Sequence, residues 1–329
     1  MVALLAVSCG SPEIPSLPPF PPSPPQKESA PKSEAELRAI LKETCKEASQ
    51  LYVTEGFPIG VVSPDLCNFK LEDEHFDNET IAGFDANGLK VQMLASSGKF
   101  VNFFNWAVSH ANFENRKTPL PTKWTPEHAI EVASKFADIF VKPWGASLGK
   151  PSARSGDLTD KLSSSSLFPG DWEIMWGIQT PTGIPYEMGR VKVVLSEKYG
   201  PSIISTIIGS SQYEDKHLVP ISENKALSLS RKCLDIAISE SRADGSYPDP
   251  YVLPDKPTIS LMVVSPHEMM YEPKSLPASG FLKQSKARLA WVVTYQVTTS
   301  YQYQHGGVQV YIDAIDGRCL CCSYVPLWA

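Results

Sequence analysis

Residues 308–322 read VQVYIDAIDGRCLCC, and this stretch sets the expectations for the whole chain. An alternating apolar run leads into Asp313 and Asp316, Gly317 follows, and a second run begins at Cys319. Glycine readily adopts the left-handed backbone conformation that short hairpin loops require. The stretch therefore predicts two antiparallel strands joined by a tight turn at Gly317.

The same pattern occurs twice more in the chain. VQMLASSGKFVNF (91–103) turns at Gly98, and VKVVLSEKYGPSIIS (191–205) turns at Gly200. Further strands are predicted in two apolar runs, DWEIMWGIQ (171–179) and ARLAWVVTYQV (287–297). These patterns predict three hairpins, each with a glycine at the turn.

A helix is predicted before each of these β-rich stretches. Residues 33–53 carry apolar side chains at helical spacing, with Ser33 and Glu36 forming a capping box. Two more helices open at Thr125, before Pro126, and at Ser222. The chain is thus predicted to contain an N-terminal segment and three α+β units, at 1–32, 33–121, 122–212 and 213–329.

The third unit resembles a PepSY-type domain through its helix, its strand RLAWVVTYQV and the segment GGVQVYIDAIDGRCL. The second unit is similar, but Ser196 replaces the turn aspartate; the first shares only the hairpin, with Leu94 at that position. The resemblance covers about residues 122–329 and implies a cystatin-like fold, in which one helix packs on a curved antiparallel sheet. It further implies an extracytoplasmic module of the kind found in peptidase propeptides, inhibitors and envelope proteins, and it brings no catalytic residues.

The N-terminal segment, residues 1–32, indicates where the protein resides. MVALLAVSCG resembles a bacterial lipobox, which makes Cys9 the candidate lipidation site, although no lysine or arginine precedes the apolar run. Residues 11–32 are proline-rich and predict a polyproline stalk about 70 Å long. We therefore expect a lipoprotein anchored in the cell envelope or periplasm. The alternatives are a disordered N-terminus with an incidental cysteine and a tail that binds an SH3-like partner.

Composition and motifs limit the possible functions. A net charge of −6 without a dense basic run argues against a nucleic-acid partner, and no apolar run reaches the ~20 residues of a membrane span. The sequence contains no GxSxG, HExxH or P-loop motif. We therefore predict no catalytic residues and no cofactor, and a membrane contact through the lipid anchor alone.

The cysteines of the opening stretch leave two interpretations open. Their CxCC spacing lacks the second Cys or His pair of a zinc site, so no metal is expected. Strand alternation predicts that Cys319 and Cys321 share a face, under the helix that carries Cys233. Either could then form a disulfide with Cys233; otherwise the thiols pack as small apolar groups. Asp313 and Asp316 are interpreted as turn caps.

Three functions follow from these features. The first is a non-enzymatic envelope protein that binds a protein or peptide partner, such as a peptidase, through an open sheet face or a sheet edge. The second is a module for glycans or small molecules, in which Tyr301 and Tyr303 share one strand face as a binding platform with the aromatics of FVNFFNW (100–106). The third is an enzyme or cation site in the acidic segment around His75, LEDEHFD (71–77).

Overall fold

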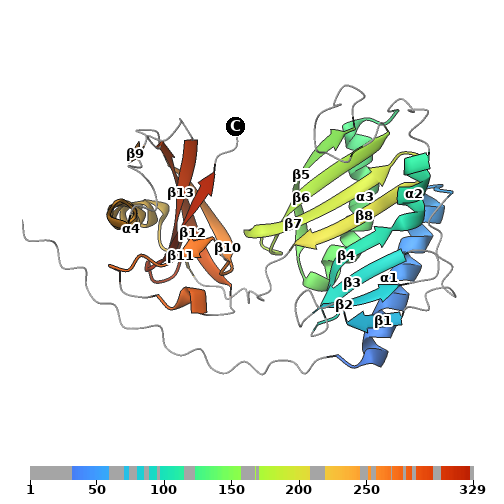
Figure 1. Ribbon diagram of the computed structural model, residues 1–329, viewed down its shortest axis with the longest axis horizontal. Coiled ribbons are helices and arrows are strands. Elements are labelled where there is room, and N and C mark those ends of the chain that lie inside the picture. The colour runs from blue at the N-terminus through green and yellow to red at the C-terminus, as the bar shows by residue number, and fades with distance from the viewer. Residues whose placement is uncertain are drawn as a thin grey trace, which may run out of the picture.

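A computed structural model of the 329-residue chain shows an α+β protein in which helices pack on a large sheet (Figure 1). The described residues are 32–58, 70–73, 80–84, 89–94, 97–114, 123–156, 167, 170–207, 219–244, 251–252, 257–267, 269–276, 279–283, 287–298 and 305–326. The mixed α+β class expected from the sequence is confirmed.

The three helices predicted from the sequence are confirmed, and their N-termini are capped as expected. Helix α1 (Glu34–Thr54) begins after Ser33, which forms the complete capping box with Glu36. Helix α3 (Pro126–Val141) begins after Thr125, whose side chain accepts from the His128 amide. Helix α4 (Glu223–Asp244) follows Ser222, whose Oγ accepts from the Lys225 amide at 3.4 Å. Local sequence therefore determines where these helices begin.

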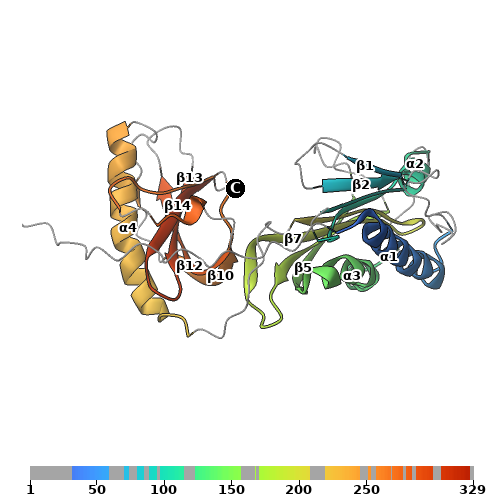
Figure 2. The ribbon, with the colours of Figure 1, turned by 90° about the horizontal axis from the view of Figure 1, so that it is seen from below.

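The first eight strands form one continuous sheet in the order β1-β2-β3-β4-β8-β7-β6-β5. Its strands are β1 (Lys70–Asp73), β2 (Thr80–Phe84), β3 (Leu89–Leu94), β4 (Phe100–Asn105), β5 (Ser147–Ser155), β6 (Asp171–Gln179), β7 (Pro185–Ser196) and β8 (Gly200–Ile207). Helices α1 and α3 lie on the same side of it (Figure 2) and share its core. The short helices α2 (Trp106–Glu114) and η3 (Lys142–Trp144) follow β4 and α3 in the chain.

The remaining strands form the second lobe, with α4 packed against β12, β13 and β14. They are β9 (Tyr251–Val252), β10 (Thr258–Val264), β11 (Met270–Tyr271), β12 (Arg288–Thr298), β13 (His305–Asp313) and β14 (Cys319–Pro326), with η4 (Phe281–Lys283) between β11 and β12. The order is β10-β12-β13-β14-β11, and β9 pairs with β12. The residues packed between α4 and these strands form one core, which we call the α4 core. A second core, which includes Phe281 and Tyr311, lies on the opposite face of the strands.

The two lobes meet through the N-terminal part of β7. This part extends beyond the first sheet toward β10 (Figure 1), and Tyr186 pairs with Val263 in parallel. All other strand pairings in the described part of the chain are antiparallel. The start of β7 therefore lies against the second lobe, which places its side chains at the boundary between the lobes.

The three predicted glycine hairpins are confirmed. Gly98, Gly200 and Gly317 all have positive φ, at 69°, 89° and 79°. The first and third turns share a hydrogen-bond pattern, in which the glycine amide donates to the carbonyl four residues earlier, on Leu94 at 2.7 Å and on Asp313 at 3.0 Å. A side chain at these positions would be strained by its backbone conformation alone.

Gly200→Ala tests how tightly one of these hairpins is packed. A Cβ at Gly200 would lie 2.7 Å from Tyr52 Cε1 and 2.8 Å from Phe57 Cδ2, in addition to the strain at φ 89°. We expect a loss of about 3 kcal/mol in the free energy of unfolding, measured by urea denaturation. The control is Gly183→Ala, where φ is 85° and none of the described residues has an atom within 4 Å of the added Cβ. It should cost only about 1 kcal/mol, and equal losses would contradict the packing argument.

Candidate functional site

The first sheet presents one face that neither α1 nor α3 covers, which we call the open face. Two rows of paired residues cross six strands on this face, and all their side chains are half-buried or exposed. The rows are Gln92–Asn102–Ser205–Lys192–Met175–Ser152 and Lys90–Phe104–Ile203–Val194–Glu173–Arg154. Between them, the residues that point to the helix side include Val91, Phe103, Ile204, Val193 and Ile174, each at most 2% exposed. The alternation divides the sheet into a core face and an open face.

Apolar side chains occupy the middle of the open face, and polar ones flank them. Phe104, Ile203 and Val194 are consecutive partners across β4, β8 and β7. At one end of the row Arg154 bonds Glu173 at 2.8 Å, and in the neighbouring row the Asn102 amide donates to Gln92 at 2.7 Å. The open face therefore combines an apolar centre with a charged and hydrogen-bonding margin.

The aromatic segment FVNFFNW (100–106) divides between the core and the open face. Phe100 and Phe103 are buried and pack edge-on against Phe140 of α3. Phe104 lies on the open face, and its ring stacks on Trp106 with centroids 6.4 Å apart. Trp106 is 59% exposed, so it is available for contact. Phe100 and Phe103 therefore belong to the core and not to the binding platform considered from the sequence.

Strand β5 forms one edge of this sheet and is poorly suited to pairing with another strand. Within the described part of the chain it pairs with β6 alone, and its sequence, SLGKPSARS, contains Gly149, Lys150 and Pro151. The register with β6 is irregular between Leu148 and Pro151. Proline lacks an amide donor, and charges and bulges on edges discourage strand addition. A partner is therefore better accommodated by the open face than by this edge.

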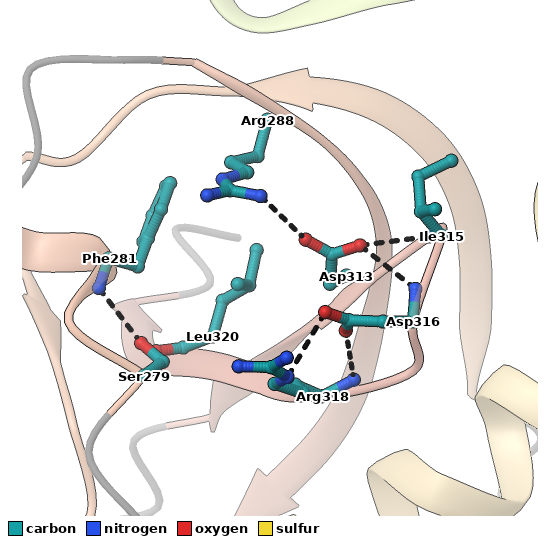
Figure 3. Close-up of polar contacts among 8 residues, drawn as sticks. All are labelled: Ser279, Phe281, Arg288, Asp313, Ile315, Asp316, Arg318 and Leu320. Atoms are coloured by element: carbon teal, nitrogen blue, oxygen red, sulfur yellow. Dashed lines mark hydrogen bonds and ion pairs between the residues drawn. The ribbon is translucent and has the colours of Figure 1, made fainter. Parts of the chain in front are cut away.

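The aspartates of the opening stretch cap the third hairpin, as expected (Figure 3). Asp313 Oδ1 accepts from the amides of Ile315 at 2.8 Å and Asp316 at 3.2 Å, and Asp316 Oδ1 accepts from the Arg318 amide at 2.9 Å. Asp313 is 2% exposed and lies 3.5 Å from the Arg288 guanidinium. Desolvation raises the pKa of Asp313, while the backbone bonds and Arg288 oppose that rise. The network stabilises a turn and holds the carboxylate in place.

A β-bulge places the cysteines of β14 differently from the sequence-based expectation. Tyr311 pairs with Cys321, whereas the next residue, Ile312, pairs with Cys319, so Leu320 is an extra residue in β14. Cys319 and Cys322 consequently belong to the α4 core, and Cys321 belongs to the opposite core. The prediction that Cys319 and Cys321 share a face is wrong. The extra residue, Leu320, inverts the strand alternation on which that prediction was based.

The boundary between the lobes contains a buried polar group that sequence reasoning missed, which we call the junction cluster: Glu187, His267, Gln309 and Tyr311. The Tyr311 hydroxyl contacts Glu187 Oε1 from across the boundary and lies 2.8 Å from Gln309 Oε1. His267 Nε2 lies 3.9 Å from the same Glu187 oxygen, and the Glu187 side chain is only 10% exposed. No motif marks this cluster, because its members come from different strands and loops.

Burial controls the chemistry of the junction cluster. Desolvation raises the pKa of Glu187 to about 7, and the hydrogen bond from Tyr311 lowers it in part. Burial and the neighbouring carboxylate also raise the pKa of Tyr311. Glu187 Oε2 is buried and has no hydrogen-bond partner among the residues that the structure describes. A carboxyl group in this setting gains or loses a proton near neutral pH.

Several predicted site residues lie outside the part of the chain that the structure describes. These are Cys9, the stalk at 11–31, His75, and the tyrosine pair Tyr301 and Tyr303. Within the described ranges, no group of three or more His, Cys, Asp or Glu side chains is arranged to hold a metal ion. The helices in those ranges include none that is long and apolar enough to span a membrane.

Comparisons with known proteins give a distant similarity in structure. No protein-family model matches the chain, and no curated protein sequence matches it. Among solved structures, the Bacillus megaterium YpeB C-terminal domain is similar at 10% sequence identity and a TM-score of 0.36, over 90% of this chain and 98% of that chain. The function proposed below therefore rests on this chain's own residues.

The raised pKa of Glu187 predicts a specific dependence of stability on pH. Because the folded state binds this proton more tightly than an ordinary carboxyl with a pKa of 4.5, stability falls as pH rises from about 4.5 to about 7. The full loss is on the order of 3 kcal/mol. Glu187→Gln should therefore be more stable than the native protein at pH 8, with a smaller difference at pH 5.

Urea unfolding at both pH values checks this prediction, since other carboxyl groups titrate equally in both proteins. The control is Glu131→Gln, whose side chain is 65% exposed and which should change stability by less than about 0.5 kcal/mol at either pH. If Glu187→Gln changed the free energy of unfolding equally at pH 5 and pH 8, the raised pKa assigned to Glu187 would be contradicted.

Proposed function

We propose that this chain is a non-enzymatic cell-envelope protein that binds a protein or peptide partner on its open face, with a peptidase as the leading class of partner. Cys9 would carry a lipid anchor, and residues 11–32 would hold the folded part away from the membrane. The lipid anchor would supply the membrane contact, and the function calls for no cofactor or nucleic acid. The extracytoplasmic location is part of the same proposal.

The composition of the open face is the observation that carries this proposal. Interfaces between separately folded proteins combine an apolar, aromatic-rich centre with a polar rim. The open face has this arrangement, with Phe104, Ile203 and Val194 central and Lys90, Glu173 and Arg154 around them. Tryptophan and arginine are also the residues that most often dominate binding energy, and Trp106 and Arg154 are both exposed.

The arrangement of helices and hairpins supports the finer description as cystatin-like and PepSY-like units. Helix α3 packs on β5, β6, β7 and β8, and α4 packs on β12, β13 and β14. In each case one helix covers antiparallel strands that include a hairpin with a glycine turn, at Gly200 and at Gly317. We propose on this basis that residues 122–212 and 213–329 are two such units, preceded by a shorter unit at 33–121.

A glycan-binding module is the second candidate, and the exposed stack of Trp106 on Phe104 favours it. Sugar rings pack on exposed aromatic faces, and Gln92 and Asn102 on the same face could supply hydrogen bonds. Tyr301 and Tyr303, which lie outside the described residues, remain part of this candidate. The binding experiment below distinguishes these candidates, because only one of them predicts a protein as the captured species.

Crosslinking from the open face tests the proposed function. A photoreactive phenylalanine analogue replaces Met175, which is 38% exposed, in the full chain expressed in its source cells. We expect capture of one envelope protein, which is then purified and titrated against the chain. Trp106→Ala should weaken that binding by at least about tenfold, as expected for an interface hot spot.

The matched control is Val53→Ala, because Val53 is an equally exposed apolar residue on α1, at 62%. It should change the dissociation constant by less than about twofold. The photoreactive analogue is also placed at position 53, and capture of a protein from there but not from position 175 would contradict the proposal. Equal effects of Trp106→Ala and Val53→Ala on the dissociation constant would contradict it as well. Binding of glycans alone, lost in Trp106→Ala, would establish the second candidate instead.

The lipid anchor is tested separately at Cys9. We expect Cys9→Ala to abolish incorporation of radiolabelled fatty acid and to move the protein from the membrane fraction to the soluble fraction. Cys45→Ala is the control, because Cys45 is a buried residue of α1 and is not predicted to be lipidated. Unchanged labelling of Cys9→Ala would show that the cysteine is incidental.

A further inference from the structure

Three cysteines lie together between α4 and β14. Cys233 on α4 and Cys322 on β14 are members of the same buried core, and Cys319 packs against it. The neighbouring thiols of Cys233 and Cys322 raise the pKa of the Cys319 thiol, together with its burial. Cys321, which belongs to the opposite core, is separated from this group by the bulge at Leu320. The cysteines are reduced in this structure.

A packing contact one helical turn before Cys233 positions α4 against the start of β14. A Cβ at Gly317 would lie 3.0 Å from Leu229 Cδ1, so Leu229 sits directly over that glycine. Cys233 follows Leu229 by four residues, about one helical turn, so both lie on the same side of α4. Cys319 begins β14 two residues after Gly317, and it packs against the core that contains Cys233.

From this alignment we propose that Cys233 and Cys319 form a disulfide that fastens α4 to β14, with Cys322 as a third thiol positioned to exchange with it. The bond would close a loop from residue 233 to residue 319, which contains η4 and most strands of the second lobe. Cys319 packs against the core that holds both other thiols, so it is common to either pairing. This inference does not depend on the proposed partner.

The oxidant required is a disulfide of the glutathione or dithiol-oxidase class, and the electrons balance as follows. The Cys319 thiolate attacks the oxidant disulfide, forming a mixed disulfide and releasing one thiolate. The Cys233 thiolate then attacks the Cys319 sulfur and releases the second. Two protein thiols thus lose two protons and two electrons, and the oxidant is reduced to two thiols. Oxidants of this class act outside the cytoplasm, where the proposed lipoprotein would be located.

Accessibility indicates which thiol reacts first. Cys319 is partly exposed, whereas Cys233 is 6% exposed and Cys322 is fully buried. The neighbouring thiols of Cys233 and Cys322, followed by burial, raise the pKa of Cys319. Since the thiolate is the reacting form, the reaction should be slow near neutral pH and should accelerate as pH rises.

The test oxidises the folded full chain with glutathione disulfide at pH 8.5 and maps crosslinks by mass spectrometry of the unreduced digest. We expect a crosslink between the peptides that contain Cys233 and Cys319, and an increase in the melting temperature of several degrees that dithiothreitol reverses. Cys233→Ser and Cys319→Ser should each abolish both effects. Cys321→Ser is the matched control from the same strand and should retain both.

Three results would overturn the proposal. One is a crosslink that survives Cys319→Ser but is lost in Cys321→Ser, and another is a bond confined to Cys319 and Cys322 within β14. The third is mixed glutathione adducts without any crosslink to Cys233. Since serine is close to cysteine in size, circular dichroism of each variant verifies that it remains folded.

Discussion

The pairing of β4 with β8 is the interaction on which the candidate binding face depends. Asn102, Phe103 and Phe104 pair with Ser205, Ile204 and Ile203, which joins strands that lie about a hundred residues apart in sequence. Thr206 Oγ1 reinforces this strand pairing by donating to the carbonyl oxygens of Phe100 at 2.5 Å and Val101 at 3.2 Å. Without this pairing both strands would be exposed edges, and the apolar centre of the open face would be divided between two smaller sheets.

The local parts of the structure were predictable from sequence, and the long-range parts were not. Helix caps at Ser33 and Thr125 and the positive φ at Gly98, Gly200 and Gly317 depend on residues a few positions apart. The β4–β8 pairing depends on which edges meet in three dimensions. The bulge at Leu320 shows the limit most clearly, because a single unpaired residue moved Cys321 to the opposite core from Cys319.

The two faces of the second lobe differ in chemistry. On the α4 side, apolar residues surround three neighbouring thiols, so that helix is held by packing that a covalent bond could reinforce. On the other side, Ser279 Oγ accepts from the Phe281 amide at 3.0 Å and lies 2.8 Å from the Leu320 carbonyl, which holds η4 against β14 (Figure 3). Glu187 of the first lobe reaches Tyr311 there, and its burial favours the protonated form. A buried polar contact of this kind is satisfied in one relative placement of the lobes, which favours that placement.

Hydrogen exchange of the folded chain, resolved to individual strands, tests the central claim that β1–β8 form a single sheet. Strands of one cooperative sheet open together and share a free energy of opening. The account predicts that the paired amides of β4 and β8 exchange within about tenfold of those in β6 and β7, near the rate of global unfolding. If the β4 amides exchanged several orders of magnitude faster than those of β7, the pairing of β4 with β8 would be open in solution. The continuous face proposed as the binding site would then not exist.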